Sequence, residues 1–355
     1  MSGKETRIPI ANIFFMLAYA WDIPPTWQKR VVDQSDYDSL WELLARLLIE
    51  SSEGIFKRGL ARDYVLKVES INGAKGRLDP GRTYRTLAWH HAKTVCAYDE
   101  FEPDIPINQG IKATIFRLLR SSGYKLEKET RNNLKKLFQR FGEITLIETG
   151  ADRLLYSVQL QRHQLHYFFP VEVCKFILNN TTFNENNGKY EFLDFERDHE
   201  RMGKLFEKFI FNYYKRHLNN WRVKREIIGW NVDEGGIGAD FLPEMRTDIT
   251  LERPDRKIVI DAKFYHEPMK SSFPGSIKKF TSANLYQLNT YLMHLAGNRS
   301  HKCNATAEGM LLYPVLQPLQ RLDVNFSGHR IRIESLDLNQ SWREIGKRLE
   351  ELVVN

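Results

Sequence analysis

Residues 245–265 read MRTDITLERPDRKIVIDAKFY and predict a pair of β-strands joined by a short turn around Pro254. The second strand is strongly apolar, yet it runs directly into Asp261 and Lys263. Because alternate residues of a strand face the same side, Asp261 and Lys263 share one surface. Twelve residues separate Asp248 from Asp261, and a hairpin of this length can place the two carboxylates side by side.

Two carboxylates so close repel each other unless a divalent cation lies between them, and Mg²⁺ accepts one or two carboxylates together with water and phosphate oxygens. The sequence therefore predicts a magnesium site held by Asp248 and Asp261. Lys263 would orient a water molecule or neutralise charge that builds on a phosphate oxygen. The alternative is a solvated surface ion pair, which contributes roughly 0–1 kcal/mol. The metal site is favoured because a predicted helix precedes the hairpin and another follows it.

The order of predicted elements indicates two domains. A chain of 355 residues that is 42% hydrophobic can bury a substantial core. Before residue 180, helical patterns surround a small β-element with a glycine-rich tip at residues 60–98, which predicts an α+β domain. The helical patterns cover residues 12–21, 37–48, 111–119, 132–141 and 154–178. Pro170 must interrupt or start a helix. The polar, Asn-rich stretch 179–189 is the candidate boundary.

The second domain is predicted to be α/β, with a mixed sheet flanked by helices. Helical spacing and short apolar runs predict, in order, a helix at 199–218, strands at 223–229, 245–252 and 257–264, a helix at 282–295 and a strand at 309–315.

Composition excludes several classes of protein. The net charge of +7 permits a polyanionic partner without requiring one. Cys96, Cys174 and Cys303 are far apart and odd in number, so neither a disulfide framework nor a zinc site is indicated, and a reducing cytoplasm is expected. The most apolar early run, residues 13–21, is shorter than the ~20 residues that span a bilayer, so it predicts a buried helix and no membrane association.

The hairpin that carries Asp248, Asp261 and Lys263 resembles the core of PD-(D/E)XK nucleases, with Thr247 in the position of the proline. The resemblance implies that these three residues catalyse phosphodiester hydrolysis. Gln287 and Tyr291 lie four apart on one face of the following helix and resemble the Gln-x-x-x-Tyr element of RecB-like members. Ordinary core patterning of that helix is the alternative.

Four further residues are weaker candidates. Glu207, in the helix that opens the second domain, could approach the metal as a third acid or could face solvent. Lys270, Lys278 and Lys279 lie in EPMKSSFPGSIKKF, a loop that could lay positive charge along a DNA backbone or could serve only solubility.

Over nearly its full length the sequence resembles the McrC family, the nuclease subunits of McrBC modification-dependent restriction systems. The matching stretches are IPIANIFFMLAYAW, GAKGR, VEVCKFILNN, YEFLDFERD, LPEMRTDITL, IVIDAKFY and NLYQLNTYL. The resemblance implies a nuclease domain over residues 190–355 that cuts double-stranded DNA containing methylated cytosine. It also implies that a domain over residues 1–180 docks into the pore of an McrB-type AAA+ GTPase hexamer and stimulates GTP hydrolysis.

GTP would be bound by that partner, because no G-x-x-x-x-G-K-[ST] run occurs in this chain. The stretch NGAKGR at 72–77 is predicted to form the tip of the β-element, since Gly73 and Gly76 accept the positive φ of a tight turn. Lys75 and Arg77 at this tip would act on the partner, or would be solvated turn residues.

Two alternatives from other classes stay open. A free-standing nuclease of DNA repair or recombination would need its own DNA-recognition surface, and the modest net charge gives little sign of one. A structural activator would retain the nuclease residues without using them.

Overall fold

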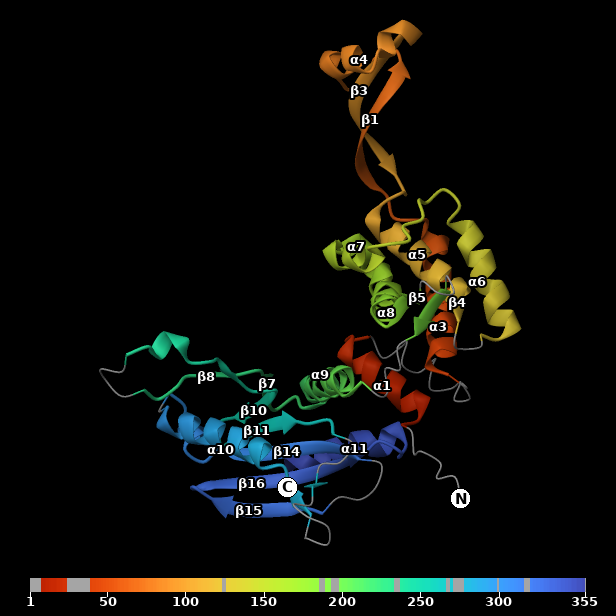
Figure 1. Ribbon diagram of the computed structural model, residues 1–355. Helices are drawn as coiled ribbons and strands as arrows, with labels where there is room; N and C mark the ends of the chain where they lie inside the picture. Colours follow the sequence, from red (N-terminus) through yellow and green to blue (C-terminus); the bar gives the residue numbers. More distant parts are fainter. Residues whose placement is uncertain are drawn as a thin grey trace. The chain divides into compact units, whose positions relative to one another are not determined.

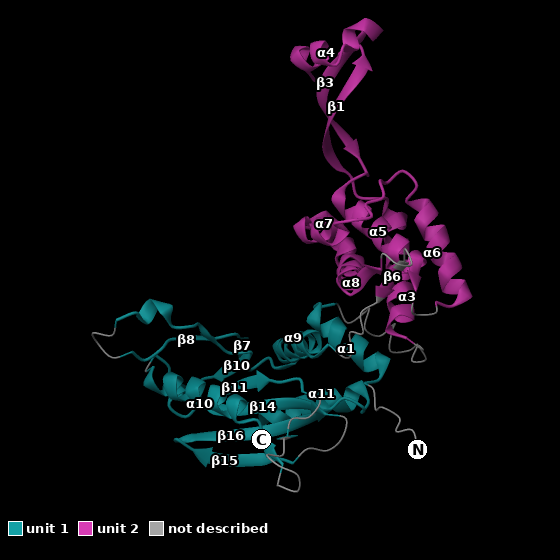
Figure 2. Ribbon diagram, viewed as in Figure 1, with its two compact units in different colours: residues 1–38, 194–355 teal, residues 39–193 magenta. Residues whose placement is uncertain are grey.

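The computed structural model describes residues 8–23, 39–122, 126–184, 189–192, 198–232, 237–265, 269–270, 278–298, 300–315 and 320–354. The chain forms two compact units, which Figure 2 distinguishes by colour. One unit consists of residues 1–38 and 194–355, and the other of residues 39–193.

Helix α1 (Ile10–Ala20) belongs to the C-terminal unit, so the structure divides the chain differently from the predicted domain of residues 1–180. Nine of its eleven residues are buried, as expected for a helix that is apolar on all sides. The Asn12 side-chain amide donates to the carbonyl oxygens of Leu338 and Gln340 at 2.7 and 2.8 Å. No helix among the described residues is long and apolar enough to cross a membrane.

The second boundary lies between residues 193 and 194, a few residues beyond the predicted stretch 179–189. Residues 185–188 and 193–197 lie outside the described part of the chain.

The C-terminal unit is built on a mixed β-sheet. Within the described residues, six strands pair in the order β15, β16, β14, β11, β10, β7. Strand β14 is parallel to β11 and β16, and the other neighbouring pairs are antiparallel. The strands are β7 (Arg222–Lys224), β10 (Ile249–Arg253), β11 (Arg256–Ala262), β14 (Glu308–Val315), β15 (Leu322–Phe326) and β16 (His329–Asp337). The mixed sheet confirms the predicted α/β class.

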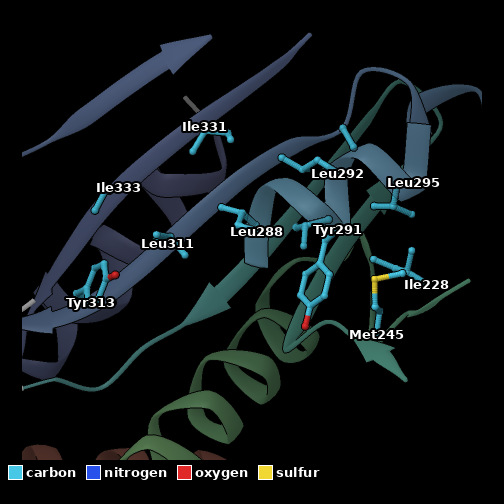
Figure 3. Packing of buried hydrophobic residues seen from close by; sticks show 12 residues of the cluster. Ile228, Met245, Leu288, Tyr291, Leu292, Leu295, Leu311, Tyr313, Ile331 and Ile333 are labelled. Carbon is cyan, nitrogen blue, oxygen red and sulfur yellow. The ribbon is translucent and has the colours of Figure 1, made fainter. Parts of the chain in front are cut away.

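Helices cover both faces of this sheet (Figure 1). On one face, α10 (Ser282–Gly297) contributes to a buried cluster that Figure 3 shows in close view; its members include Val259, Leu288, Leu292, Leu295, Leu311, Ile331 and Ile333. On β11, the alternating residues Ile258 and Ile260 are also fully buried. On the other face of the sheet, to which Ile258 and Ile260 belong, α9 (His199–His217) contacts β10 and β11, and α11 (Trp342–Val354) contacts β16. Because β11 is buried on both faces, its central residues 258–260 form a continuous apolar run.

Two of the predicted strands are interrupted by a bend. Strand β8 (Ile227–Ile228) follows β7, and β9 (Met245–Arg246) precedes β10; β8 pairs with β9 outside the main sheet. Thr247 holds the bend closed, because its N–H donates to the Glu226 carbonyl at 3.0 Å and its Oγ1 accepts from the Glu226 N–H at 2.9 Å. Asp248 follows immediately, at the start of β10.

The second unit contains a helical body with small strands, in agreement with the predicted α+β character. Its helices are α3 (Leu40–Arg58), α5 (Pro106–Arg120), α6 (Lys128–Arg140), α7 (Ala151–Ser157), the 3₁₀ helix η2 (Arg162–Tyr167) and α8 (Phe168–Asn179). Pro170 lies in the first turn of α8, where its missing N–H removes no helical hydrogen bond. A short sheet joins β4 (Ser121–Ser122), β5 (Thr181–Asn184) and β6 (Lys189–Phe192).

A β-ribbon projects from this helical body, and residues 63–102 are called the finger here (Figure 1). Strands β1 (Asp63–Asn72) and β3 (Lys93–Glu102) pair along their whole length. The short β2 (Arg77–Leu78) pairs with the other edge of β3, and α4 (Pro80–Arg85) and the 3₁₀ helix η1 (Ala88–His91) follow it.

The stretch at 72–77 is not the end of the finger, which corrects the predicted tip. Arg77 and Val68 both lie opposite Ala97, so the chain folds back after Asn72 and crosses to the other edge of β3. Gly76 allows this crossing: its φ is +66°, and a Cβ there would lie 2.5 Å from the Ala97 carbonyl oxygen. The end of the finger is formed by α4 and η1 (Figure 1).

A buried charged cluster stabilises the centre of the C-terminal unit. The Lys257 ammonium is 1% exposed and lies 3.0 Å from Glu252 and 3.2 Å from Glu226. It also donates to the Asn304 side-chain oxygen at 2.6 Å, and Lys224 lies 2.8 Å from Glu252. Burial alone would raise the pKa of Glu252, but hydrogen bonds from Lys224 and Lys257 outweigh it and lower this pKa to about 2. Each charge in the cluster is therefore compensated.

Acid should remove the contribution of Glu252 to stability. Its pKa is lower in the folded chain than the ordinary value of 4.5, so the contribution is complete above about pH 4.5 and is lost as pH falls toward about 2. Glu252→Gln should therefore lower the free energy of unfolding at pH 7 by about 3 kcal/mol, and the difference from wild type should close between pH 4.5 and 2. Urea unfolding from pH 2 to 7 measures this. Glu351→Gln, which removes an exposed carboxylate, is the control; parallel pH curves for wild type and Glu252→Gln would contradict the prediction.

Candidate active site

The pairing of β10 with β11 brings Asp248 and Asp261 together. Ile249 lies opposite Ile260 in the last pair of the ladder, and Asp248 and Asp261 are the residues next to that pair. The Oδ2 atom of Asp248 accepts a hydrogen bond from the Ala262 N–H at 2.9 Å. The carboxylate of Asp248 is thereby held at the end of β11 beside Asp261.

Asp261 is a buried carboxylate whose hydrogen-bonding capacity is unused. Its side chain is 1% exposed, and neither oxygen has a hydrogen-bond partner among the described residues. The Lys263 ammonium lies 3.0 Å from its Oδ1, which is an ion-pair contact without hydrogen-bond alignment. Burial raises the pKa of Asp261 to about 7; the charge of Lys263 opposes this rise, and the charge of Asp248 adds to it.

A chain of hydrogen bonds positions Lys263. Its ammonium donates to Gln287 Oε1 at 3.0 Å, and Gln287 Nε2 donates to the Tyr291 hydroxyl at 2.9 Å. The Tyr291 hydroxyl donates in turn to the Arg246 carbonyl at 3.2 Å. In Figure 3 the ring of Tyr291 packs beside Leu288 and Leu292, and its hydroxyl points away from them. Gln287 of the predicted pair thus contacts the predicted lysine, and Tyr291 contacts Gln287.

The positive charge of Lys263 is favoured by its neighbours. Burial lowers the pKa of its ammonium, but the carboxylates of Asp261 and Asp248 outweigh that effect and raise it. Lys263 therefore stays protonated at neutral pH.

Glu207 on α9 lies near the same group of charges. Burial raises the pKa of Glu207, and the negative charge of Asp248 raises it further, whereas Arg225 and Lys263 oppose the rise. An ion pair of 2.6 Å joins Glu207 to Arg225. Sequence patterns gave no reason to select Arg225, because it lies in the bend between β7 and β8.

The predicted DNA-binding lysines lie on or next to a short hairpin outside the main sheet. Lys278 and Lys279 are exposed, and neither forms an ion pair or hydrogen bond with Asp248 or Asp261 in the part of the chain that the structure describes. Strands β12 (Met269–Lys270) and β13 (Lys279–Phe280) form a short hairpin. The side chain of Lys270 and residues 266–268 and 271–277 lie outside the described residues.

The predicted finger residues have different surroundings. The Lys75 ammonium lies 3.8 Å from the centre of the Tyr98 ring and 3.6 Å from Glu100, so it folds back along the ribbon. Arg77 is exposed on β2.

The acidic pair fits a magnesium ion. The described residues contain no group of three His, Cys, Asp or Glu side chains that could hold a metal. Mg²⁺ does not require such a group, because it keeps several water molecules and takes one or two protein carboxylates. The two oxygens of Asp261, which accept no hydrogen bond from the described residues and lie beside a second carboxylate, are the donors that such an ion would use.

Comparison with known proteins gives one family over most of the chain. Residues 4–314 match the family described as "McrBC 5-methylcytosine restriction system component". The chain is 30% identical over 352 residues to the Escherichia coli (strain K12) protein "Type IV methyl-directed restriction enzyme EcoKMcrBC", with 98% of each chain covered.

A solved structure has the same fold. It is the Thermococcus gammatolerans structure titled "Refined half-complex from tetradecameric assembly of Thermococcus gammatolerans McrB AAA+ hexamers with bound McrC", with a TM-score of 0.57 and 19% identity. The match covers 98% of this chain and 76% of that chain. The extent of the family match and the identity to the Escherichia coli protein show that this chain belongs to the McrBC 5-methylcytosine restriction system component family.

Proposed function

We propose that this chain is the endonuclease subunit of a GTP-dependent, modification-dependent restriction complex. It would cut DNA that contains methylated cytosine by Mg²⁺-dependent hydrolysis of phosphodiester bonds, in a PD-(D/E)XK-type site. The observation that carries the proposal is the group of Asp248, Asp261 and Lys263 at one end of a doubly buried strand, in a member of the McrBC family.

Each side chain of the site has a distinct role in this proposal. Asp248 and Asp261 hold Mg²⁺, which when bound lowers the pKa of a water molecule and neutralises charge on the phosphate. The Lys263 ammonium stabilises negative charge that develops on a phosphate oxygen. Gln287 holds Lys263 in place, and the Tyr291 hydroxyl fixes the orientation of Gln287.

Two further sets of residues would support catalysis. Glu207, held by Arg225, adds negative charge near Asp248 and strengthens the attraction for a cation. Lys279 on β13 and the preceding Lys278 are exposed and would contact the DNA backbone, together with Lys270 on β12.

The partner of this chain would be an McrB-type AAA+ GTPase hexamer, the assembly named for the Thermococcus gammatolerans structure. The finger supplies a surface for that contact. Tyr64, Leu66, Val68 and Phe101 are between 40% and 70% exposed, and Tyr64 lies opposite Phe101 with ring centres 5.2 Å apart. An apolar face of this kind on an isolated ribbon marks an interaction site. GTP would be bound by the partner.

Cleavage of a methylated plasmid in the presence of the partner and GTP tests the site. Asp248→Ala and Asp261→Ala should abolish cleavage, because each removes a metal ligand. Lys263→Ala should slow cleavage about 10²–10³-fold, the range for loss of one electrostatic stabiliser. Asp255→Ala removes an exposed carboxylate from the β10–β11 turn and should leave the rate unchanged.

Three outcomes would contradict this account. A normal rate for Asp261→Ala would refute the metal site. Equal cleavage by wild type with and without the partner would favour a free-standing nuclease. GTPase stimulation without any cleavage would indicate an activator whose nuclease residues are idle.

Stimulation of the partner's GTPase tests the role of Lys75 and Arg77. At saturating concentrations of this chain, the double variant Lys75→Ala, Arg77→Ala should lower the partner's stimulated rate of GTP hydrolysis about fivefold or more. The affinity for the partner should change less, because these charges would order the partner's catalytic groups. Lys135→Ala, Lys136→Ala on α6 removes two charges from the same unit and is the control. Full stimulation by the finger variant would show that the activating surface does not include Lys75 and Arg77.

A further inference from the structure

The chain continues beyond β11 in the same alternating pattern. The Lys263 N–H donates to the Leu312 carbonyl at 3.0 Å, so pairing with β14 extends one residue past the end of β11. The next side chain, Phe264, turns to α9, where its ring centre lies 6.4 Å from that of Phe206. Because alternate residues of an extended chain face the same side, Tyr265 returns to the face of the sheet that carries Lys263.

Tyr265 rests on buried aromatic residues. Its ring centre lies 6.3 Å from that of Tyr313 on β14, which is fully buried and is labelled in Figure 3. The Tyr313 hydroxyl accepts a hydrogen bond from the Asn284 side-chain amide at 2.9 Å. The rings of Tyr313 and Phe280 are stacked with their centres 6.4 Å apart. Tyr313 is therefore fixed in position, and it supports the ring of Tyr265.

The phenol of Tyr265 is open to solvent beside the catalytic lysine. Tyr265 is 42% exposed. Burial lowers the pKa of the Lys263 ammonium, and the charges of Asp261 and Asp248 raise it. Tyr265 adds a smaller effect in the same direction, so its hydroxyl lies within electrostatic range of that ammonium. A supported and exposed phenol in this place can contact a substrate that is bound at the site.

The spacing of Lys263 and Tyr265 suits successive phosphates of one DNA strand. Two residues of an extended chain span roughly 7 Å, which is close to the step between neighbouring phosphates. Lys263 acts on the scissile phosphate in the proposed mechanism, so the Tyr265 hydroxyl can reach the next phosphate along the strand. Tyrosine hydroxyls are among the groups that contact DNA phosphates and fix the register of a protein on the duplex.

We infer that Tyr265 is a substrate-binding residue of the nuclease site. Its hydroxyl donates a hydrogen bond to the phosphate next to the scissile one, and its ring packs against the sugar between the two phosphates. The inference rests on the proposed function, because it takes DNA as the substrate. It adds a residue that positions the strand for cleavage without carrying charge.

Steady-state cleavage of a methylated plasmid, by the complex with the GTPase partner, tests this inference. Tyr265→Phe should raise KM about fivefold and Tyr265→Ala about tenfold or more. The value of kcat should change little, because the lost contacts are equally strong in the ground state and the transition state. Lys263→Ala should instead lower kcat. The control Phe326→Ala removes a ring of similar exposure from β15, three strands away from β11, and should behave as wild type.

DNA binding gives a second readout that does not depend on cleavage. Fluorescence anisotropy with a labelled methylated duplex would use the full chain with Asp261→Asn, across a salt series. In this background Tyr265→Phe should weaken binding about fivefold and leave the slope of log affinity against log salt unchanged, because no charge is lost. Lys279→Gln should reduce that slope by about one if it removes a phosphate contact.

Two results would overturn the inference. One is a Tyr265→Phe variant with the KM and DNA affinity of wild type, since only a packing role would then remain for the ring. The other is a loss confined to kcat, which would make Tyr265 a positioning residue for Lys263. Because Tyr265→Phe keeps the ring on Tyr313, its melting temperature should equal that of wild type.

The two readouts also separate this inference from the proposed function. A wild-type complex that does not cleave, formed by a chain that binds DNA, would refute the nuclease function, and the anisotropy measurement would still decide the contact of Tyr265. A complex that cleaves normally with Tyr265→Phe and Tyr265→Ala would refute the contact alone. If the chain neither binds nor cleaves DNA, both conclusions fail.

Discussion

The antiparallel pairing of β10 with β11 is the interaction on which the site depends. Ile249 opposite Ile260 sets the register, and the next position places Asp248 beside Asp261. A slip of one residue would turn the side chain of Asp248 to the opposite face of the sheet. The bend that Thr247 forms with Glu226 fixes where β10 begins, so it also limits this slip.

Asp261 differs in its surroundings from Lys257, another buried charge of the C-terminal unit. Lys257 is surrounded by Glu252, Glu226 and Asn304, which offset the free energy of burying its ammonium. Asp261 has one cation nearby, a second carboxylate beside it and two oxygens without hydrogen-bond partners in the described chain. Asp261 is therefore a buried carboxylate whose oxygens accept no hydrogen bond from the described chain, as expected for a group that binds a ligand.

Much of this site could be predicted from the sequence because its determinants are local. The apolar run of β11 and the twelve-residue separation between Asp248 and Asp261 specify a hairpin, and the spacing of Gln287 and Tyr291 specifies one face of α10. Arg225 could not be identified in this way, since its contact with Glu207 depends on how α9 packs against the bend after β7.

The parts that sequence patterns did not predict depend on contacts between distant residues. The packing of α1 on the C-terminal unit uses Leu338 and Gln340, more than 300 residues away. The glycine-rich stretch at 72–77 has the composition of a hairpin tip, yet Gly76 serves a crossing over β3, and this depends on the close approach of the Ala97 carbonyl. The terminal strands β15 and β16 and helix α11 have short or mixed sequence patterns. Their places follow from contacts along the sheet: β16 pairs with β14, β15 pairs with β16, and α11 contacts β16.

The central claim is that the carboxylate pair is arranged for a cation. The most direct test compares the melting temperatures of wild type and Asp261→Asn. Each full chain is measured without its partner, in the absence and in the presence of Mg²⁺. Without metal, Asp261→Asn should melt about 2–8 °C above wild type, the shift for a stabilisation of roughly 1–2 kcal/mol, because it removes a buried charge that Asp248 also repels. Mg²⁺ at 100 times its dissociation constant should stabilise wild type by about 2.7 kcal/mol and leave Asp261→Asn unchanged. An Asp261→Asn chain that is less stable than wild type without metal, or that gains as much from Mg²⁺, would contradict the account.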